Sequence, residues 1–276
     1  MRLLFVTDLH GSIRKYEILL KEARAVRAQV VVNGGDMLPT EGDLFRQGDF
    51  IRTFLARHFE AYDHAGIHYL CFLGNDDLRI FDGLLAETAA RCGYVHVLAQ
   101  RWLSLGAFEF IGMNWVADYP FRLKDRCRRD TESFRFPPQY GSALVSTARG
   151  WKEIPDWFGY AAQLPSLAEE LENLPQPRRW QDTVCIMHMP PAHLGLDVCQ
   201  DGRRVGSQAI HDYLKAHQPL LSLHGHIHES PRMSGHWQAW LGKTLCLQPG
   251  QGAGLTYVAV DLATRECRRF VLPNVR

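Results

Sequence analysis

The sequence contains 276 residues, of which 46% are hydrophobic and 22% are charged, and this ordinary globular composition excludes a disordered, collagen-like or coiled-coil chain. The formal net charge is +1 at pH 7, so no global field attracts the protein to nucleic acid or to an anionic membrane. No apolar run approaches the roughly 20 residues that span a bilayer.

The first hundred residues alternate between strand and helix signals. Expected strands lie at residues 3–6, 30–32, 69–73 and 95–98, and expected helices lie at 16–26, 51–62 and 84–89. We expect Gly93 to end the last of these helices. Residues 3–6 are too few for a signal peptide, which needs about 7 to 15 apolar residues, so we interpret them as the first strand. This alternation predicts parallel strands joined by crossover helices.

In the rest of the chain, a hairpin over residues 102–111 and the strands after residue 237, which Gly242-Lys243 interrupts, are predicted to be antiparallel, and this makes the sheet mixed. Further helices are expected at 167–174 and 210–214, and further strands at 183–187, 220–223, 237–247, 255–260 and 267–272. The irregular stretch at about 118–165 is rich in proline and aromatic residues, and we predict a cap or long loop over a site there. We expect residues 1–276 to form a single domain with this insertion.

Ligand-type side chains follow five of the predicted strands. They are Asp8 and His10, then Asp36, then Asn75, Asp76 and Asp77, then His188, and finally His226 and His228. Ligands bind at the carboxyl ends of parallel strands, so residues remote in sequence can converge there. Carboxylate, imidazole and amide groups together suit Zn, Mn or Fe rather than a thiolate site.

We predict two divalent metal ions bridged by one carboxylate. The expected ligands are Asp8, His10, Asp36 and His228 for one ion, and Asp36, Asn75, His188 and His226 for the other. Two cations about 3.5 to 4 Å apart would clamp a phosphoryl oxygen and turn a bridging water into hydroxide near neutral pH. That hydroxide would attack phosphorus without any side-chain base.

The order of these blocks resembles the signature of the calcineurin-like metallophosphoesterase superfamily, which is Asp-x-His, Gly-Asp, Gly-Asn-His-Asp or Glu, a lone His, and Gly-His-x-His. The matching segments are Asp8-Leu9-His10, Gly35-Asp36, Gly74-Asn75-Asp76-Asp77, His188 and Gly225-His226-Ile227-His228. The tail of the match, residues 226–230, most resembles the Icc-related branch of predicted phosphoesterases. The resemblance implies an α/β fold, a four-layer αββα sandwich with mixed sheets, and hydrolysis of phosphomonoesters or phosphodiesters.

The chain departs from that signature at Asp76, where many members carry histidine. In those members the histidine is thought to stabilise the transition state or to protonate the leaving oxygen. An aspartic acid with a pKa near 4 is a poor acid at pH 7 unless burial or nearby carboxylates raise that pKa. We therefore hypothesise modest turnover or substrates with good leaving groups. His224 is a second candidate acid, although a buried supporting role for it is equally compatible with the sequence.

A basic run between residues 122 and 135 offers candidate substrate contacts. Arg122 and Arg126 are candidate phosphate contacts, because the guanidinium group matches phosphate oxygens, and the adjacent Phe121 and Phe134 could stack a base. Acidic residues interrupt the run, and such mixed charge is more typical of a solvated face.

The leading hypothesis is a cytoplasmic two-metal phosphoesterase that acts on a small phosphate ester, with a nucleotide as one candidate substrate. Seven scattered cysteines without a Cys-x-x-Cys pair favour the reduced thiols of a cytosol. A metal-dependent nuclease is one alternative, and salt-dependent binding of oligonucleotides would favour it. The alternative from another class is a scaffold that keeps the fold without catalysis, and Asp76 is the feature that supports it.

Overall fold

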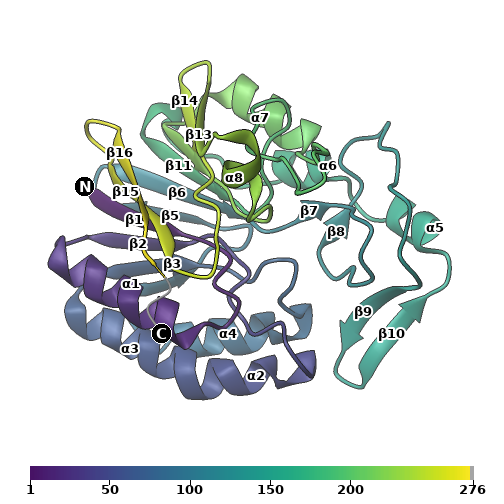
Figure 1. Ribbon diagram of the computed structural model, residues 1–276, viewed down its shortest axis with the longest axis horizontal. Coiled ribbons are helices and arrows are strands. Elements are labelled where there is room, and N and C mark those ends of the chain that lie inside the picture. Colours follow the sequence, from purple (N-terminus) through teal and green to yellow (C-terminus); the bar gives the residue numbers. More distant parts are fainter. Residues whose placement is uncertain (274–276) are drawn as a thin grey trace.

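The computed structural model describes residues 1–273, and two six-stranded sheets packed face to face form its centre (Figure 1). The strand order of the first sheet is β16 (Glu266–Val271), β15 (Thr256–Asp261), β1 (Arg2–Val6), β2 (Val30–Asn33), β3 (His68–Cys71) and β4 (Val95–Val97). Strands β1 to β4 run parallel, and β15 and β16 are antiparallel additions at one side. The predicted parallel arrangement of the first hundred residues is therefore confirmed.

The second sheet is also mixed. Its strand order is β13 (Gln238–Leu241), β14 (Thr244–Leu247), β12 (Leu221–Leu223), β11 (Thr183–Met187), β6 (Phe108–Met113) and β5 (Trp102–Leu105). The four central strands are parallel, whereas β13 and β5 pair antiparallel with their neighbours. The hairpin predicted over residues 102–111 is the pair β5 and β6.

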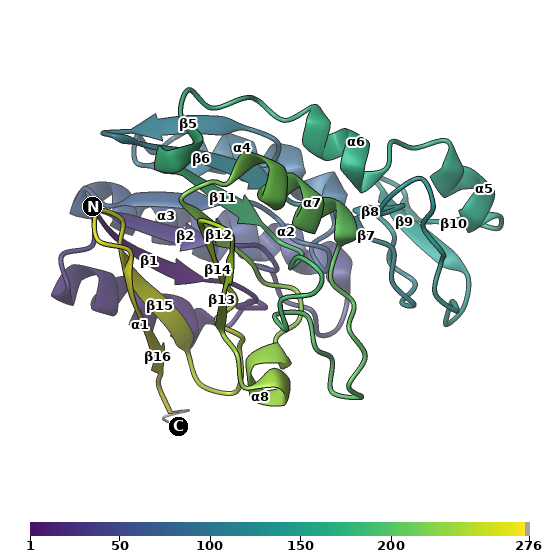
Figure 2. The same ribbon diagram turned by 90° about the horizontal axis from the view of Figure 1, so that it is seen from above.

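Helices cover both outer faces of the sheet pair (Figures 1 and 2). The first sheet carries α1 (Ile13–Ala25), α2 (Gln47–Phe50), a π-helical turn (Ile51–Leu55), α3 (Ala56–Ala65) and α4 (Asp82–Ala89). The second sheet carries α6 (Leu167–Glu172) and α7 (Gln208–His217), and the short α8 (Ser230–Ser234) follows β12. Single 3₁₀ turns lie at Leu44–Arg46, Arg79–Phe81 and Trp180–Asp182. The layers are helix, sheet, sheet and helix, which is the αββα sandwich that the resemblance implies.

The side chains of β1 show why both faces of a central strand are apolar. Leu3 and Phe5 lie in the cluster between the two sheets, and Leu4 and Val6 lie in the cluster under the helices. All four are fully buried. Because successive residues of a strand point to opposite faces, a strand covered on both sides must be apolar throughout.

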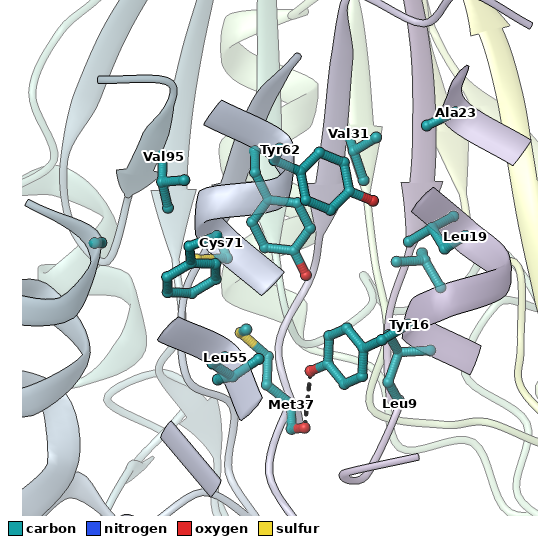
Figure 3. Close-up of a cluster of buried hydrophobic side chains, with 14 of the residues drawn as sticks. Leu9, Tyr16, Leu19, Ala23, Val31, Met37, Leu55, Tyr62, Cys71 and Val95 are labelled. Carbon is teal, nitrogen blue, oxygen red and sulfur yellow. Dashed lines mark hydrogen bonds between the residues drawn. The ribbon is translucent and has the colours of Figure 1, made fainter. Parts of the chain in front are cut away.

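The core under the helices also anchors one of the loops that carry predicted ligands (Figure 3). Tyr16 of α1 is buried there, and its hydroxyl donates a hydrogen bond to the carbonyl oxygen of Met37 at 2.8 Å. Met37 directly follows Asp36 in the chain. Helix packing therefore fixes the backbone next to the predicted bridging carboxylate.

The segment predicted as a cap, residues 118–165, projects beyond one end of the sheets in both views (Figures 1 and 2). It contains β8 (Cys127–Arg128), which pairs with β7 (Val116–Ala117), the hairpin of β9 (Ala143–Thr147) and β10 (Gly150–Ile154), and α5 (Trp157–Ala162). We keep the name cap for this segment. The sequence did not predict its hairpin, because that hairpin buries only one residue of each strand and its hydrophobic alternation is weak.

A buried ion pair holds the start of the cap. The ammonium of Lys124 lies 2.8 Å from a carboxylate oxygen of Asp118, and both side chains are fully buried. Lys124 also donates to the carbonyl oxygen of Tyr119, and Gln139 donates to the second oxygen of Asp118 at 2.9 Å. Breaking one partner of such a pair would leave a charge in the interior, so this network fixes the cap loop firmly.

Several helix boundaries differ from the prediction by a few residues, and the ends near Gly93 and Gln47 illustrate this. Helix α4 ends at Ala89, before Gly93 is reached, because the backbone bonds of Arg91 and Cys92 reach back three residues rather than four. The helical stripe predicted over residues 51–62 begins earlier, at Gln47, and passes through the π-helical turn before α3. Within residues 1–273, no helix has the length and apolar character needed to cross a bilayer.

Candidate metal centre and its cavity

The seven predicted ligands lie in loops that follow the carboxyl ends of five strands. Asp8 and His10 follow β1, Asp36 follows β2, Asn75 follows β3, His188 follows β11, and His226 and His228 follow β12. Four of the seven have positive backbone φ angles, which are 56° at Asp8, 44° at His10, 50° at Asp36 and 69° at His226. Residues other than glycine seldom adopt this conformation, and it concentrates at functional sites.

One group of four side chains forms a compact cluster. Asp8, His10, Asp36 and His228 each offer a ligand atom, and these atoms all lie within 4.8 Å of one another. The Nε2 atoms of His10 and His228 are 3.2 Å apart, and Nε2 of His228 is 3.9 Å from Oδ1 of Asp8. Two carboxylates and two imidazoles at this spacing are a donor set that suits a borderline divalent cation.

A second group converges beside the first. The side-chain oxygen of Asn75 lies 2.8 Å from Nε2 of His188 and 2.5 Å from Nδ1 of His226. Nε2 of His188 also lies 3.3 Å from Oδ2 of Asp36. Asp36 therefore contacts both groups, which is the position that a bridging carboxylate requires.

The orientation of His188 is set by the backbone. Its Nδ1 lies 2.7 Å from the carbonyl oxygen of Gly34. Because a carbonyl oxygen only accepts hydrogen bonds, Nδ1 carries a hydrogen and Nε2 faces Asn75 and Asp36. The ring thus presents a defined nitrogen to the centre of the site.

The pKa values of His188 and Asp36 depend on each other. Burial opposes a charge on His188, but the carboxylate of Asp36 outweighs that effect and raises the pKa of His188 to about 9. Burial likewise opposes a charge on Asp36, but His188 holds the pKa of that carboxyl well below its usual range. A proton on His188 therefore neutralises Asp36, a role that a bound cation would also fulfil.

Two buried polar atoms of the first group support the same conclusion. Oδ2 of Asp8 and Nδ1 of His10 have no hydrogen-bond partner within residues 1–273. Buried polar atoms are nearly always satisfied, so an orphaned carboxylate oxygen here indicates a missing electropositive partner. Together with the oxygen and nitrogen donor set, this shows that the residues fit divalent cations.

Glycines next to the ligands make the close approach of the loops possible. A Cβ atom on Gly74 would overlap the carboxylate of Asp36. A Cβ atom on Gly225 would overlap Thr7 and lie 2.8 Å from Oδ2 of Asp8. At both positions a side chain would push a predicted ligand out of place.

Asp77 ties two of the ligand loops together. Its buried carboxylate accepts hydrogen bonds from the backbone N–H groups of Met37 at 2.9 Å, Leu38 at 2.8 Å and Gly74 at 2.8 Å. Burial first, and then the nearby charge of Asp36, raise the pKa of Asp77 to about 6. Asp77 therefore connects the loop of Asp36 to the loop of Asn75 without facing the cavity.

A cavity of about 1070 Å³ opens over this centre. The floor of the cavity is formed at the proposed metal centre, where the lining residues are Asp36, Asn75, Asp76, His226 and His228. Its walls come from the cap, mainly residues 118–140, and from the loop at residues 199–206. This volume is slightly above the range usual for small-molecule sites, which is about 300 to 1,000 Å³.

The family of the chain follows from its sequence as well as from this geometry. The family model described as calcineurin-like phosphoesterase matches residues 1–230. The chain belongs to the calcineurin-like phosphoesterase family. The family acts on phosphate esters with the help of divalent metals, so the protein is a metal-dependent phosphoester hydrolase.

Solved structures of other proteins share the fold of this phosphoesterase. The protein TT1561 of Thermus thermophilus is 17% identical, with 98% of each chain covered and a TM-score of 0.58. A dimetal phosphatase from Danio rerio is 12% identical, with 94% of this chain and 91% of that chain covered and a TM-score of 0.50. A comparison with curated protein sequences finds no match. At these identities the likeness concerns the fold alone.

Asp76 is the candidate acid that the structure places at the cavity of the phosphoesterase. It lines the cavity beside Asn75, whose amide donates to its carboxylate at 2.8 Å. Burial, and then the charge of Asp36, raise the pKa of Asp76 to about 7. An acidic role for Asp76 requires a raised pKa, and the direction of this shift agrees with that requirement.

His224, the second candidate acid, lies away from the cavity that Asp76 lines. It is fully buried, is not part of the cavity lining within residues 1–273, and burial lowers its pKa to about 4. Its Nδ1 lies 3.1 Å and 3.0 Å from the carbonyl oxygens of Met187 and Met189, which flank His188. This position favours the supporting role that the sequence left open, and the prediction of His224 as an acid gains no support.

The two arginines predicted to contact phosphate do not line the cavity within residues 1–273. Arg126 is almost fully buried, and its guanidinium donates to the carbonyl oxygen of Gly74 at 2.7 Å and to the carboxylate of Asp82. Arg122 is exposed and donates to the carbonyl oxygen of Ser142 at 3.2 Å. Arg126 therefore braces a ligand loop from behind, and we leave both arginines out of the proposed substrate contacts.

Other basic and aromatic residues line the cavity instead. Arg135, Arg203, Arg204 and Tyr140 are exposed there, and the half-buried Tyr119 also lines the cavity. Arg135 belongs to the basic run that the sequence indicated, but the loop that carries Arg203 and Arg204 has no motif or periodic pattern. No sequence signal identified the 199–206 loop as part of the site.

Proposed function

We propose that the protein binds two divalent cations, Mn, Fe or Zn, and hydrolyses phosphodiesters in preference to phosphomonoesters. The observation that carries this proposal is the contact of Asp36 with both ligand groups. The proposed ligands are Asp8, His10, Asp36 and His228 for one cation, and Asp36, Asn75, His188 and His226 for the other. When bound, the two cations would stabilise charge on the phosphoryl oxygens and lower the pKa of a water molecule between them.

The preference for diesters is supported by the size and charge of the cavity. About 1070 Å³ leaves room for ester groups on both sides of phosphorus. Asp76, which lines the cavity beside Asn75, offers no positive charge in either protonation state, whereas a histidine at that position can. Position 76 therefore supplies no positive charge for the second negative charge of a phosphomonoester. A phosphodiester carries a single negative charge, so it depends less on a cation at that position. We also propose that Asp76 donates the proton to the leaving oxygen.

We further propose that the protein acts in the cytoplasm. All seven cysteines lie within residues 1–273 and are free thiols there. Five of them are buried among apolar side chains, where burial raises the thiol pKa and keeps the thiol inert, as for Cys185. This usage of cysteine favours a reducing compartment.

Hydrolysis of two nitrophenyl esters tests the proposal. The Mn²⁺-loaded protein should hydrolyse bis(4-nitrophenyl) phosphate faster than 4-nitrophenyl phosphate, and a chelator should abolish both reactions. Asp36→Asn and His188→Ala should lose activity by a factor of about 10³ or more while unfolding at nearly the wild-type temperature. His96→Ala, which removes a histidine outside the site, is the matched control and should keep its activity.

The possible results separate the proposal from its rivals. Full activity of Asp36→Asn would contradict a catalytic centre at this position. A wild-type protein that binds Mn²⁺ tightly but hydrolyses neither ester would favour the scaffold alternative. A faster reaction with the monoester would reject the diester preference and leave the metal centre intact.

A further inference from the structure

A row of aromatic rings leads from the metal centre to the outer edge of the cavity. The ring centroid of Tyr119 lies 5.8 Å from that of the proposed ligand His226. Phe121 follows at 5.9 Å from Tyr119, and Tyr140 follows at 5.7 Å from Phe121. Tyr119, Phe121 and Tyr140 line the cavity, and we call them the ring row.

The two outer members of the ring row are unusually exposed. Phe121 is 63% exposed and Tyr140 is 59% exposed, although both are large aromatic side chains. They contact each other edge to face, and their high exposure leaves ring surface accessible to another planar group. Exposed aromatic residues inside a concave cavity, beside a reactive centre, are typical of a ligand site rather than of a chance surface patch.

Hydrogen bonds fix two parts of the ring row, the side chain of Tyr119 and the backbone of Tyr140. The hydroxyl of Tyr119 donates to the carbonyl oxygen of Leu123 at 2.7 Å, and the ammonium of Lys124 lies 4.9 Å from the centre of its ring. The backbone N–H of Tyr140 donates to the carbonyl oxygen of Pro120 at 2.8 Å. These bonds reduce the conformational entropy that a stacking ligand would have to offset at Tyr119 and at the backbone of Tyr140.

Guanidinium groups from the 199–206 loop lie at the same cavity. Arg203 donates a hydrogen bond to the carboxylate of Asp201 at 2.6 Å. Arg203 lines the same cavity as Tyr140, the outer member of the ring row. Arg204 also lines the cavity and forms no ion pair within residues 1–273. Guanidinium groups donate to the oxygens of planar heterocycles and of phosphates and stack on rings, so they complement the aromatic residues.

We propose that the ring row binds a planar heteroaromatic group on the ester side of the substrate, so that the preferred substrates are phosphodiesters of nucleosides or of similarly planar alcohols. This inference rests on the proposed hydrolysis at the metal centre. Tyr119 separates His226 from Phe121, which leaves space for a sugar between phosphorus at the metals and a base stacked on Phe121 and Tyr140. Phe121 and Tyr140 are then residues that determine specificity.

The test compares two diesters that share one leaving group. Thymidine 5′-(4-nitrophenyl) phosphate and methyl 4-nitrophenyl phosphate both release 4-nitrophenolate, so the ratio of their kcat/KM values reports only the retained group. The Mn²⁺-loaded wild type should prefer the thymidine ester by about tenfold or more, which is the range expected for a stacked base. Phe121→Ala and Tyr140→Ala should bring the ratio toward one, and Phe121→Trp should restore it.

The control is Trp240→Ala, which removes an aromatic residue of similar exposure (55%) on β13 and should leave the ratio unchanged. A wild-type ratio near one, or a ratio that Phe121→Ala does not change, would overturn the subsite even if both esters are hydrolysed. If neither ester is hydrolysed, the proposed function fails instead. Calorimetric titration with thymidine 5′-monophosphate then decides the subsite, because Phe121→Ala should weaken binding about tenfold and equal binding would reject it.

Discussion

Asp77 offers a quantitative test of how the site is held together, because it braces two ligand loops without facing the cavity. Its carboxylate accepts three backbone hydrogen bonds, from Met37, Leu38 and Gly74. A hydrogen bond to a charged group contributes about 1.5 to 3 kcal/mol, so three contribute about 5 to 9 kcal/mol. Replacing Asp77 with alanine would leave all three N–H groups buried and unsatisfied.

The charge of Asp77 reduces this gain. Burial and the repulsion of Asp36 raise the pKa of Asp77 from 3.8 to about 6, which costs about 3 kcal/mol at neutral pH. Because the folded pKa lies above the unfolded one, this cost is absent below about pH 4 and complete above about pH 6. Asp77→Ala should therefore lower the free energy of unfolding by about 2 to 6 kcal/mol at pH 7.

Urea unfolding in the presence of EDTA measures this quantity without a contribution from bound metal. Asp77→Asn should lose less than Asp77→Ala, because an amide oxygen in the Oδ2 position keeps the bonds from Met37 and Gly74. Asp63→Ala, which removes a single bond to the backbone of Tyr94 at an exposed site, is the control and should lose about 1 kcal/mol or less. An Asp77→Ala midpoint equal to that of the wild type would refute the assigned bracing role.

Three further predictions concern other parts of the molecule. His58 is surrounded by aromatic rings, and burial lowers its pKa to about 3, so the unfolded chain takes up a proton that the folded one does not. Wild-type stability should therefore fall by about 2 kcal/mol more than that of His58→Phe between pH 7 and pH 5 in urea titrations, and parallel pH profiles would contradict this. Lys124→Met should lower the free energy of unfolding by about 3 to 5 kcal/mol, because Asp118 is left buried and unpaired. The double variant Lys124→Met with Asp118→Leu should recover part of this loss. A double variant no more stable than Lys124→Met would contradict the explanation. Gly74→Ala should weaken Mn²⁺ binding by about 10- to 100-fold in calorimetry, since its Cβ displaces Asp36, and unchanged affinity would show that the loop relaxes.

The parallel strands and the convergence of the proposed ligands could be expected from the sequence because one physical rule connects them. Parallel strands deliver their carboxyl ends to one edge, so Asp8, Asp36 and His188 could be expected to meet although they are far apart in sequence. The contact of His188 with Asp36 and the compact group around Asp8 agree with that expectation. The conformational strain at these positions could not be predicted, because no residue pattern marks a left-handed aspartate.

Sequence patterns did not predict which residues form the walls of the cavity. A basic run shows that arginines are present, but not that Arg126 is buried against Asp82, a partner 44 residues earlier in the chain. Tyr119 and Tyr140 line the same cavity as Arg203 only through the packing of two irregular loops, and neither loop has a helical or strand period. The substrate side of the site therefore depends on tertiary contacts, whereas the metal side depends on topology.

Counting the metal ions bound to the protein tests the central claim most directly. The purified chain is loaded with Mn²⁺, freed of excess metal, and analysed by inductively coupled plasma mass spectrometry, beside Asp36→Asn and the control His96→Ala. The account predicts two Mn²⁺ ions per chain in the wild type and in His96→Ala, and at most one in Asp36→Asn. One ion or none in the wild type, or two in Asp36→Asn, would contradict a pair of cations held by a shared carboxylate.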